Sequence, residues 1–375
     1  MKIPLSNPDI TDSEREAVLA VLRTPNLSLG PKLPEFENKF AAYLGVKHAV
    51  AVNSGTSGLH LCVRALGLKD DDEVITTPFS FIASANCLLF ERVRPVFVDI
   101  DPDTLNIDVK KIVGKINKKT KAILPVHVFG YPCDMKKIMA IANKHSLSVI
   151  EDACEAVGAE IDGRKAGTFG DCSVIAFYPN KQMTTGEGGL IATNSAKIAL
   201  LARSMRNQGR DDGMGWLAHS RLGYNYRLSD INCALGIAQL KRIAELLKRR
   251  QRAADLYEAK LRGIQGLILP PRETAGIKRS WFVYVVRLAD EFSSAQRDRI
   301  ILELRAKGIG CSAYFPPIHL QPFYKKEFGF KRGDFPITEA VADRTIALPF
   351  FNRLSESQID QVVKALKAAL QGVKK

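Results

Sequence analysis

The apolar positions of this 375-residue chain form two alternating patterns, short continuous runs and longer stretches with helical spacing. The short runs predict strands at 48–52, 73–77, 95–100, 121–126, 147–150, 172–177 and 189–193. The stretches between them predict helices that begin at Thr11 and cover 35–44, 56–66, 82–90, 109–116, 135–145 and 196–205. Because strands alternate with helices, the pattern indicates a mainly parallel sheet with helices on its faces.

The pattern changes character after about residue 228. A helical pattern runs from 228 to about 262, long enough to bridge two domains. Beyond it the sequence predicts a buried strand at 281–287, a helix at 294–306, a strand at 309–314 and a final helix at 355–370. We therefore expect a large α/β domain at 1–250 and a smaller C-terminal α+β domain at 251–375.

Composition narrows the class of protein. The chain is 46% hydrophobic and 25% charged, and it shows no apolar run of membrane-spanning length and no signal-peptide core. We therefore expect a folded cytoplasmic protein that does not bind a membrane. Its seven cysteines and six histidines are scattered without metal-ligand or redox spacing, which predicts reduced thiols and no metal site.

The formal net charge is +14, and the densest basic run is 241–252. Within it Ile243, Leu246 and Leu247 recur at helical spacing. A helix with one buried stripe and a solvated basic face is favoured over a nucleic-acid surface. The chain shows no interleaved aromatic residues, helix-turn-helix signature or zinc finger that would support nucleic-acid binding.

The most informative segment surrounds Lys181. An apolar run ends at Phe177, a Pro-Asn turn follows, and Lys181 precedes a loop rich in Thr and Gly. Most lysines are solvated surface charges. An amine held between a buried strand and a tight loop can lose its solvation, which favours the neutral form. Such an amine is a candidate for forming a Schiff base.

Two further segments follow predicted strands and suit a charged ligand. Segment 53–58, Asn-Ser-Gly-Thr-Ser-Gly, can bind a phosphate through backbone N–H groups and hydroxyls, although any strand-to-helix turn favours such residues. It matches neither a Walker loop nor a dinucleotide fingerprint. Segment 149–155 places Glu151, Asp152 and Glu155 at a strand end, where a carboxylate can pair with a protonated ring nitrogen. The alternative is that Asp152 caps a helix.

Three more segments leave their roles open. Segment 78–83 contains Phe79 and Phe81; an aromatic there can lie on a heteroaromatic ring, but a core position is favoured on local grounds. Segment 223–227, Gly-Tyr-Asn-Tyr-Arg, is as typical of a binding loop as of a helix-entry turn. Tyr314 and His319 flank a rigid Pro-Pro turn; a lone histidine is usually structural, but this turn can hold it at a domain cleft.

Together these segments supply an anion cradle, a flat aromatic, a carboxylate and an amine. They would anchor a phosphate, stack on a ring, protonate a ring nitrogen and bind an aldehyde covalently. Those are the requirements for holding pyridoxal 5'-phosphate (PLP).

In this order the segments resemble the DegT/StrS-type nucleotide-sugar aminotransferases, which are PLP-dependent. The resemblance runs from Gly-Pro-Lys at 30–32 to the last helix and is most specific at 176–189 and 223–227. It implies the fold of type I PLP-dependent transferases and a homodimer with shared active sites. It also implies these roles: catalytic Schiff-base formation by Lys181; ring binding by Asp152, Glu155 and Phe81; phosphate binding by Ser54, Gly55, Thr56 and Ser57, and by Asn225 from the partner subunit; and substrate binding by Tyr314, His319 and Arg227.

Two positions depart from the family pattern. Relatives commonly have a serine five residues before the lysine, where this chain has Ala176, so the phosphate would depend more on Thr56, Ser57 or Asn225. Gln208 stands where a histidine is frequent, with no consequence that follows from the sequence. A dehydratase branch of the family replaces the lysine by histidine, so the presence of Lys181 favours amino transfer.

The resemblance implies transfer of an amino group from an amino acid, with glutamate expected, to a nucleotide-diphosphate keto-sugar for polysaccharide biosynthesis. A 4-keto-6-deoxy sugar is the preferred acceptor, and a 3-keto sugar remains open, as does the nucleotide (UDP, dTDP or GDP). The rivals are another type I PLP reaction on an amino acid and a non-catalytic regulatory or nucleic-acid-binding protein. We expect no nucleic-acid partner.

Overall fold

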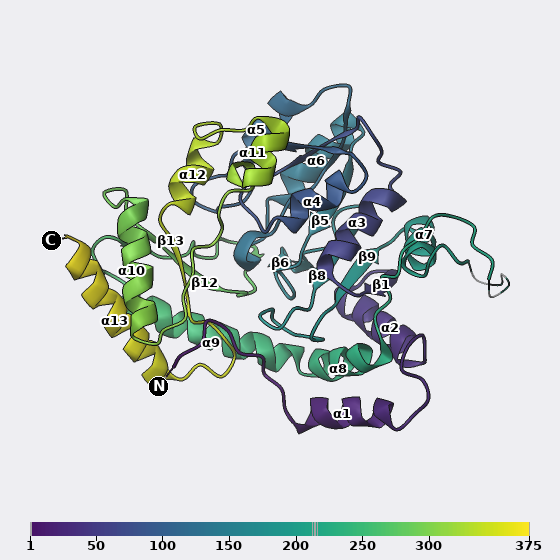
Figure 1. Ribbon diagram of the computed structural model, residues 1–375, viewed down its shortest axis with the longest axis horizontal. Coiled ribbons are helices and arrows are strands. Elements are labelled where there is room, and N and C mark those ends of the chain that lie inside the picture. The colour runs from purple at the N-terminus through teal and green to yellow at the C-terminus, as the bar shows by residue number, and fades with distance from the viewer. Residues whose placement is uncertain (1, 212, 214, 216, 375) are drawn as a thin grey trace.

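A computed structural model describes residues 2–374 except Asp212, Met214 and Trp216. Its centre is a seven-stranded sheet whose strands are largely buried (Figure 1). In spatial order the strands are β1 (His48–Val52), β9 (Gly189–Thr193), β8 (Cys172–Ala176), β5 (Ser148–Asp152), β4 (Thr120–Ile123), β2 (Glu73–Thr76) and β3 (Arg94–Phe97). All seven strands predicted from the apolar runs are therefore present, with small differences at their ends.

The sheet is mainly parallel, as predicted. Strands β8, β5, β4, β2 and β3 pair in parallel, whereas β9 is antiparallel to both of its neighbours. Residues along β1 alternate between the two faces: Val50 and Val52 belong to one apolar cluster, and Ala49 and Ala51 belong to another. Strands covered on both faces are typical of α/β proteins.

Helices cover both faces of this sheet. On one face lie α3 (Gly55–Ala65), α4 (Ala83–Leu89) and α7 (Ala196–Arg206), and on the other lie α2 (Lys32–Leu44), α6 (Met135–His145) and α8 (Asp230–Lys241). The first helix, α1 (Asp12–Leu22), packs on α8 and begins at Thr11 as predicted, with a capping box formed by Thr11 and Glu14. Short helices α5 (Val109–Ile112), η1 (Val113–Lys115) and η2 (Val128–Gly130) lie in connections.

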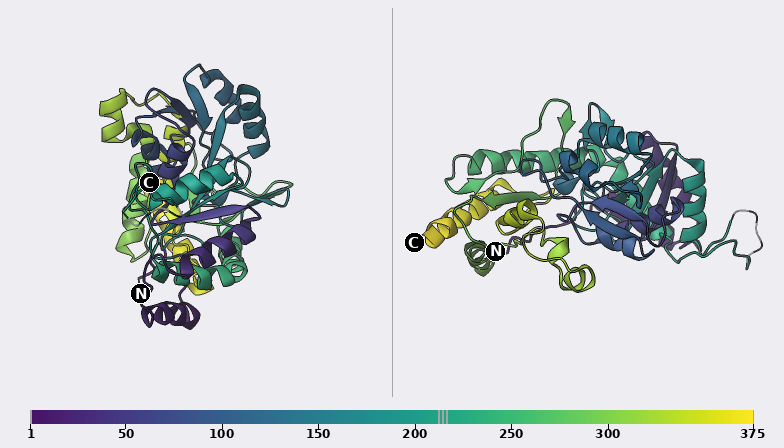
Figure 2. Two further views of the ribbon diagram at one scale, coloured as in Figure 1. Left: turned by 90° about the vertical axis from the view of Figure 1, so that its right-hand side faces the viewer. Right: turned by 90° about the horizontal axis from the view of Figure 1, so that it is seen from above.

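A second sheet forms the other end of the molecule (Figures 1 and 2). It consists of β10 (Leu267–Ile268), β12 (Tyr284–Leu288) and β13 (Thr345–Leu348), and α10 (Ser294–Ala306) and α13 (Glu356–Lys374) share its apolar cluster. The beginning of the chain also joins this part, because Ile3 bridges to Ile309. Helix α9 (Ile243–Leu261) runs without a break across residue 250, so the domain boundary placed there falls within a helix and stays a prediction.

The remaining elements connect the two parts. A small sheet contains β6 (Glu160–Ile161), β7 (Arg164–Lys165) and β11 (Ile277–Lys278). The elements η3 (Ile318–Leu320), α11 (Pro322–Phe328) and α12 (Pro336–Ala342) return to the large sheet, where Ile318, Tyr324 and Phe335 pack with Phe97 of β3. In the part of the chain that the structure describes, no helix is both long and apolar enough to cross a bilayer.

Two predictions about the second half were wrong in detail. The long helical pattern at 228–262 forms two helices, α8 and α9, which meet at Arg242, where the backbone leaves helical geometry (φ −104°, ψ 8°). The strand expected at 309–314 is reduced to isolated bridges made by Ile309 and Ser312.

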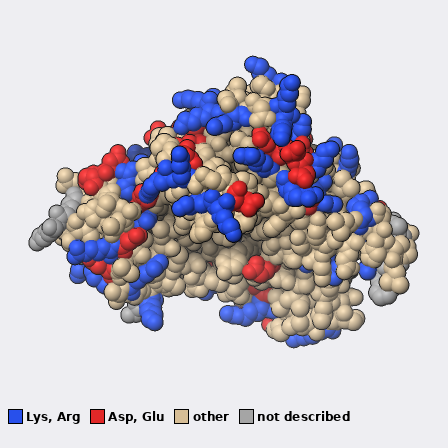
Figure 3. Space-filling model, turned by 45° about the horizontal axis from the view of Figure 1, so that its top comes forward, with Lys and Arg blue, Asp and Glu red and all other residues tan. Residues whose placement is uncertain are grey.

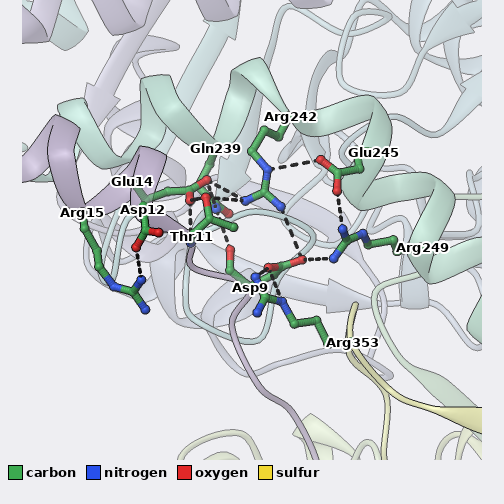
Figure 4. Close-up of polar contacts among 10 residues, drawn as sticks. All are labelled: Asp9, Thr11, Asp12, Glu14, Arg15, Gln239, Arg242, Glu245, Arg249 and Arg353. Atoms are coloured by element: carbon green, nitrogen blue, oxygen red, sulfur yellow. Dashed lines mark hydrogen bonds and ion pairs between the residues drawn. The ribbon is translucent and has the colours of Figure 1, made fainter.

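The basic run at 241–252 is less solvated than predicted. Its apolar stripe is buried as expected, with Leu246 fully covered. However, Arg242 and Arg249 lie 3.6 and 3.1 Å from the carboxylate of Asp9, and Figure 4 shows this cluster of ion pairs at the junction of α8 and α9. Arg250 is buried outright. The run therefore joins the N-terminal segment to these helices instead of forming only a solvated face.

Candidate active site

A cavity of about 710 Å³ lies where β1, β5 and β8 end at their carboxyl sides, and residues 312–316 of the C-terminal part close it. Ligands of α/β sheets usually bind at this edge. The structure brings eight of the predicted site residues to its wall: Ser54, Gly55, Thr56, Phe81, Asp152, Glu155, Lys181 and Tyr314.

Lys181 enters the cavity from the turn after β8. Its backbone N–H donates to the carbonyl of Tyr178 (2.9 Å), which fixes the Pro-Asn turn. Its side chain is only 12% exposed, and its Nζ lies 3.5 Å from Oε1 of Glu155 and 3.8 Å from the ring centre of Phe282. The amine is thus held among a carboxylate and an aromatic face instead of pointing into bulk solvent.

Glu155 is buried beside this amine. Burial raises the pKa of its carboxyl group, and the Lys181 amine and the N–H of Phe129, which donates to Oε2 (2.9 Å), oppose only part of that effect. Its backbone carbonyl accepts from Nε2 of Gln182 (2.6 Å). The carboxyl group is therefore fixed in position and biased toward its protonated form.

Asp152, the last residue of β5, is also buried. Its Oδ2 accepts from the hydroxyl of Ser84 (2.7 Å), and its Oδ1 accepts from the backbone N–H of Cys154 (3.1 Å). The segment between Asp152 and β6 contains no helix, so the alternative that Asp152 caps a helix is wrong. Because Ser84 also bonds to Ser80 (2.8 Å), a small hydroxyl network sets the orientation of this carboxylate.

The N-terminus of α3 forms another wall of the cavity. Ser54 caps the helix by accepting from the N–H of Ser57 (3.1 Å), and the hydroxyl of Ser57 donates to Oδ1 of Asn53 (2.6 Å). The first N–H groups of a helix have no partner within it, so those of Gly55 and Thr56 remain for a ligand. A Cβ on Gly55 would lie 2.9 Å from that of Ala176, so glycine is needed for α3 to start this close to β8.

The two phenylalanines of segment 78–83 differ in their placement. Phe79 is fully buried in the core, as favoured on local grounds. Phe81 is 61% exposed and lines the cavity, so the core interpretation is wrong for this residue. An exposed aromatic ring at this edge is available to stack on a flat ligand.

Four predicted residues do not line the cavity, and Ser57 is one of them. His319 is fully buried elsewhere, with Nε2 3.0 Å from Glu339 and its ring against Phe335, and burial lowers its pKa. It is not among the described residues that line the cavity, and its role in substrate binding stays a prediction. Asn225 is exposed and Arg227 donates to Oδ1 of Asn207 (3.1 Å); their roles stay predictions.

Comparison with known proteins decides the family. Residues 8–367 match the DegT/DnrJ/EryC1/StrS aminotransferase family. The chain belongs to this family. It is 41% identical to the uncharacterized protein MJ1066 of Methanocaldococcus jannaschii over 97% of both chains, and 40% identical to the GDP-perosamine synthase of Caulobacter vibrioides over 98% of both. The solved structure of PseC from Helicobacter pylori, an aminotransferase of pseudoaminic acid biosynthesis, is 30% identical, with a TM-score of 0.93 over 99% of this chain and 100% of that one.

The protein is therefore a PLP-dependent sugar aminotransferase with the fold expected from the resemblance. Its cavity fits PLP, because it presents an amine, a buried carboxylate, an exposed aromatic ring and free N–H groups at a helix start. Asn180 also lines the cavity, and its amide oxygen is buried without a hydrogen-bond partner in the described part of the chain.

Sequence reasoning missed several residues of this aminotransferase site. Ser84 holds Asp152, Gln182 holds the backbone of Glu155, and Phe282 lies beneath the amine of Lys181. Ser80 precedes α4 and Ser84 lies in its first turn, so helical spacing gave no signal for the bond between their hydroxyls. Phe282 offered no signal, because only the tertiary fold brings residue 282 next to residue 181.

Proposed function

We propose that this aminotransferase moves the amino group of glutamate to C4 of a GDP-linked 4-keto-6-deoxy sugar. The observation that carries this proposal is the 40% identity to a GDP-perosamine synthase over 98% of both chains. Two further proteins of that name, from Vibrio cholerae and Escherichia coli, are 34% and 36% identical. The amino sugar would then serve polysaccharide biosynthesis.

The residues on the cavity wall have the chemistry that amino transfer needs. PLP supplies an electron sink for the bond from Cα to hydrogen in the donor. Lys181 would hold the aldehyde of the cofactor and, once released, carry the proton as base and then acid. Asp152, fixed by Ser84, would keep the ring nitrogen protonated, and Phe81 would cover the ring. The helix start at Gly55 and Thr56 would bind the phosphate.

The cavity of one chain has too little positive charge to bind the two phosphates of a nucleotide diphosphate. Lys181 is the only Lys or Arg among the described residues that line it, and its amine is needed for the cofactor. We infer that a second copy of the chain completes the site and that Asn225 reaches the phosphate of the PLP bound to the partner subunit.

Exposed apolar side chains support such an interface between two copies, since Phe81, Phe90 and Leu222 are 61%, 53% and 67% exposed. Outside the cavity, Lys and Arg side chains spread over the face in Figure 3, where they would attract an anionic substrate.

The test is a panel of keto-sugars linked to GDP, UDP or dTDP, with the keto group at C3 or C4, incubated with PLP and glutamate and read by product mass. The proposal expects the fastest amination for the GDP-linked 4-keto sugar. Faster conversion of a 3-keto sugar or of another nucleotide would overturn that assignment. Lys181→Ala should abolish turnover, and retained turnover in this variant would refute the role of the lysine.

A further inference from the structure

Arg250 is a buried cation in the middle of α9 with no carboxylate bound to it. The residue is 3% exposed, and among the described residues the charge of Asp9 acts on it only from a distance, without an ion pair. Burial lowers the pKa of its guanidinium to about 9, because the charged form loses its solvation by water at this position. A charge kept at such a cost needs a specific use.

All of its hydrogen bonds go to backbone carbonyls next to the cavity. Nη2 donates to the carbonyls of Lys181 (2.7 Å) and Asn180 (3.3 Å), and Nη1 donates to those of Phe282 (2.9 Å) and Trp281 (3.5 Å). One planar group therefore bridges the turn that carries the amine and the segment that carries the ring beneath it. These two segments are about 100 residues apart in the chain. Gln182 also links them, because its Nε2 donates to the carbonyl (3.3 Å) and the hydroxyl (3.1 Å) of Ser280, but only Arg250 bonds to the carbonyls of both Lys181 and Phe282 in the described part of the chain.

The side chains of these two segments lie close together in the cavity. The amine of Lys181 lies 3.8 Å from the ring centre of Phe282, and 3.5 Å from Glu155. The two backbones that set this geometry are the ones that Arg250 holds. A lysine at 250 carries a single ammonium group and cannot reproduce the planar fork that reaches both segments at once.

We propose that Arg250 is a positioning residue that fixes the amine of Lys181 over the ring of Phe282 by bridging their backbone carbonyls. The proposal rests on the proposed role of Lys181. It assigns Arg250 no contact with cofactor or substrate. It predicts that covalent capture of PLP depends on the shape of the side chain at 250 and not only on folding.

The experiment measures the rate at which the full chain, freed of cofactor, captures PLP covalently, by borohydride quenching and mass analysis of the Lys181 peptide. Arg250→Lys is expected to capture PLP at least tenfold more slowly than the native chain, and to lose kcat with little change in KM for the keto-sugar. The matched control is Arg297→Lys. Arg297 is also buried and donates to two carbonyls, those of Ala342 (2.7 Å) and Thr345 (3.3 Å). None of these three residues is among those that line the cavity.

Each outcome decides the matter. Capture by Arg250→Lys at the native rate, or an equal slowing in Arg297→Lys, would overturn the proposal. If Arg250→Lys does not fold, Arg250→Gln takes its place, because one amide NH₂ cannot reach the carbonyls of both segments; native capture by that variant overturns the proposal, and slowed capture supports it. Lys181→Ala separates the two proposals, since capture that persists at the native level in this variant refutes the role of the lysine whatever Arg250 does.

Discussion

At the scale of single residues, Ala176 marks a place where the phosphate end of the cavity lacks a donor. Its Cβ faces the start of α3, close to Gly55. We predict that Ala176→Ser adds one hydrogen bond to the phosphate, worth about 1 kcal/mol, and so tightens PLP binding roughly fivefold. Equilibrium dialysis of the two chains measures this change. Pyridoxal, which lacks the phosphate, serves as the control and should bind both chains alike; equal gains for both compounds would contradict the prediction.

Glu155 gives a prediction for pH. Because burial raises its pKa above the model-compound value of 4.5, its protonated form favours folding, and that contribution is lost as pH rises through the raised pKa. Glu155→Gln cannot lose a proton. We predict that the melting temperature of this variant, measured without PLP, increases relative to that of the native chain as pH rises from 4.5 through the raised pKa of Glu155. A difference that stays constant with pH would show that Glu155 does not titrate in this way.

Most residues with reactive or ligand-binding side chains in the site could be predicted from the sequence. The residues that hold them in position could not. Lys181, Asp152 and the 53–58 turn follow strand ends, so their meeting at one edge of a parallel sheet is a matter of topology. Phe81 was misjudged on local grounds because exposure of a phenylalanine depends on what the fold places over it. Arg250 was assigned to a solvated face for the same reason: its carbonyl partners come from residues 180–181 and 281–282, which no local pattern connects to α9.

At the scale of elements, the segment before α1 is anchored by Asp9. Its buried carboxylate accepts from Nε of Arg353 (2.7 Å) and pairs with Arg242 and Arg249 of the basic run (Figure 4). We predict that Asp9→Asn lowers the free energy of unfolding by about 2–4 kcal/mol, because three cations lose their common anion. Urea denaturation measures the loss.

Asp12→Asn is the matched control for that experiment. Asp12 lies three residues away and, among the described residues, forms an ion pair only with the exposed Arg15, so its loss should change the free energy of unfolding little. Equal effects of the two substitutions would show that burial of the Asp9 cluster adds nothing.

Element prediction succeeded where the apolar pattern was local and failed where pairing is distant. The runs at 48–52 and 189–193 match β1 and β9 residue for residue, because strands buried on both faces are continuously apolar. The pattern did not show that β9 runs antiparallel between β1 and β8, because strand direction depends on the connections. The break at Arg242 was missed because helical periodicity continues across it.

At the scale of the whole molecule, the proposed homodimer with shared sites can be tested by mixing. Lys181→Ala and Asn225→Ala chains should each be impaired alone. In a mixed dimer, one site would contain an intact Lys181 with an intact Asn225 from the partner subunit. We predict that random exchange of subunits restores about a quarter of native turnover, since half of the dimers are mixed and each has one intact site. If Asn225 acts within its own chain, mixing restores nothing.

The contact between Ile3 and the C-terminal part has a consequence for how the protein is made. Ile3 donates to the carbonyl of Gly308 (2.9 Å) and accepts from the N–H of Gly310 (2.8 Å), and its side chain is buried there. The ribosome makes Gly308 and Gly310 roughly 300 residues after Ile3, a delay of about 15–60 s at ordinary elongation rates. During that delay the segment around Ile3 stays accessible to chaperones and proteases, and only synthesis past Gly310 can withdraw it from them.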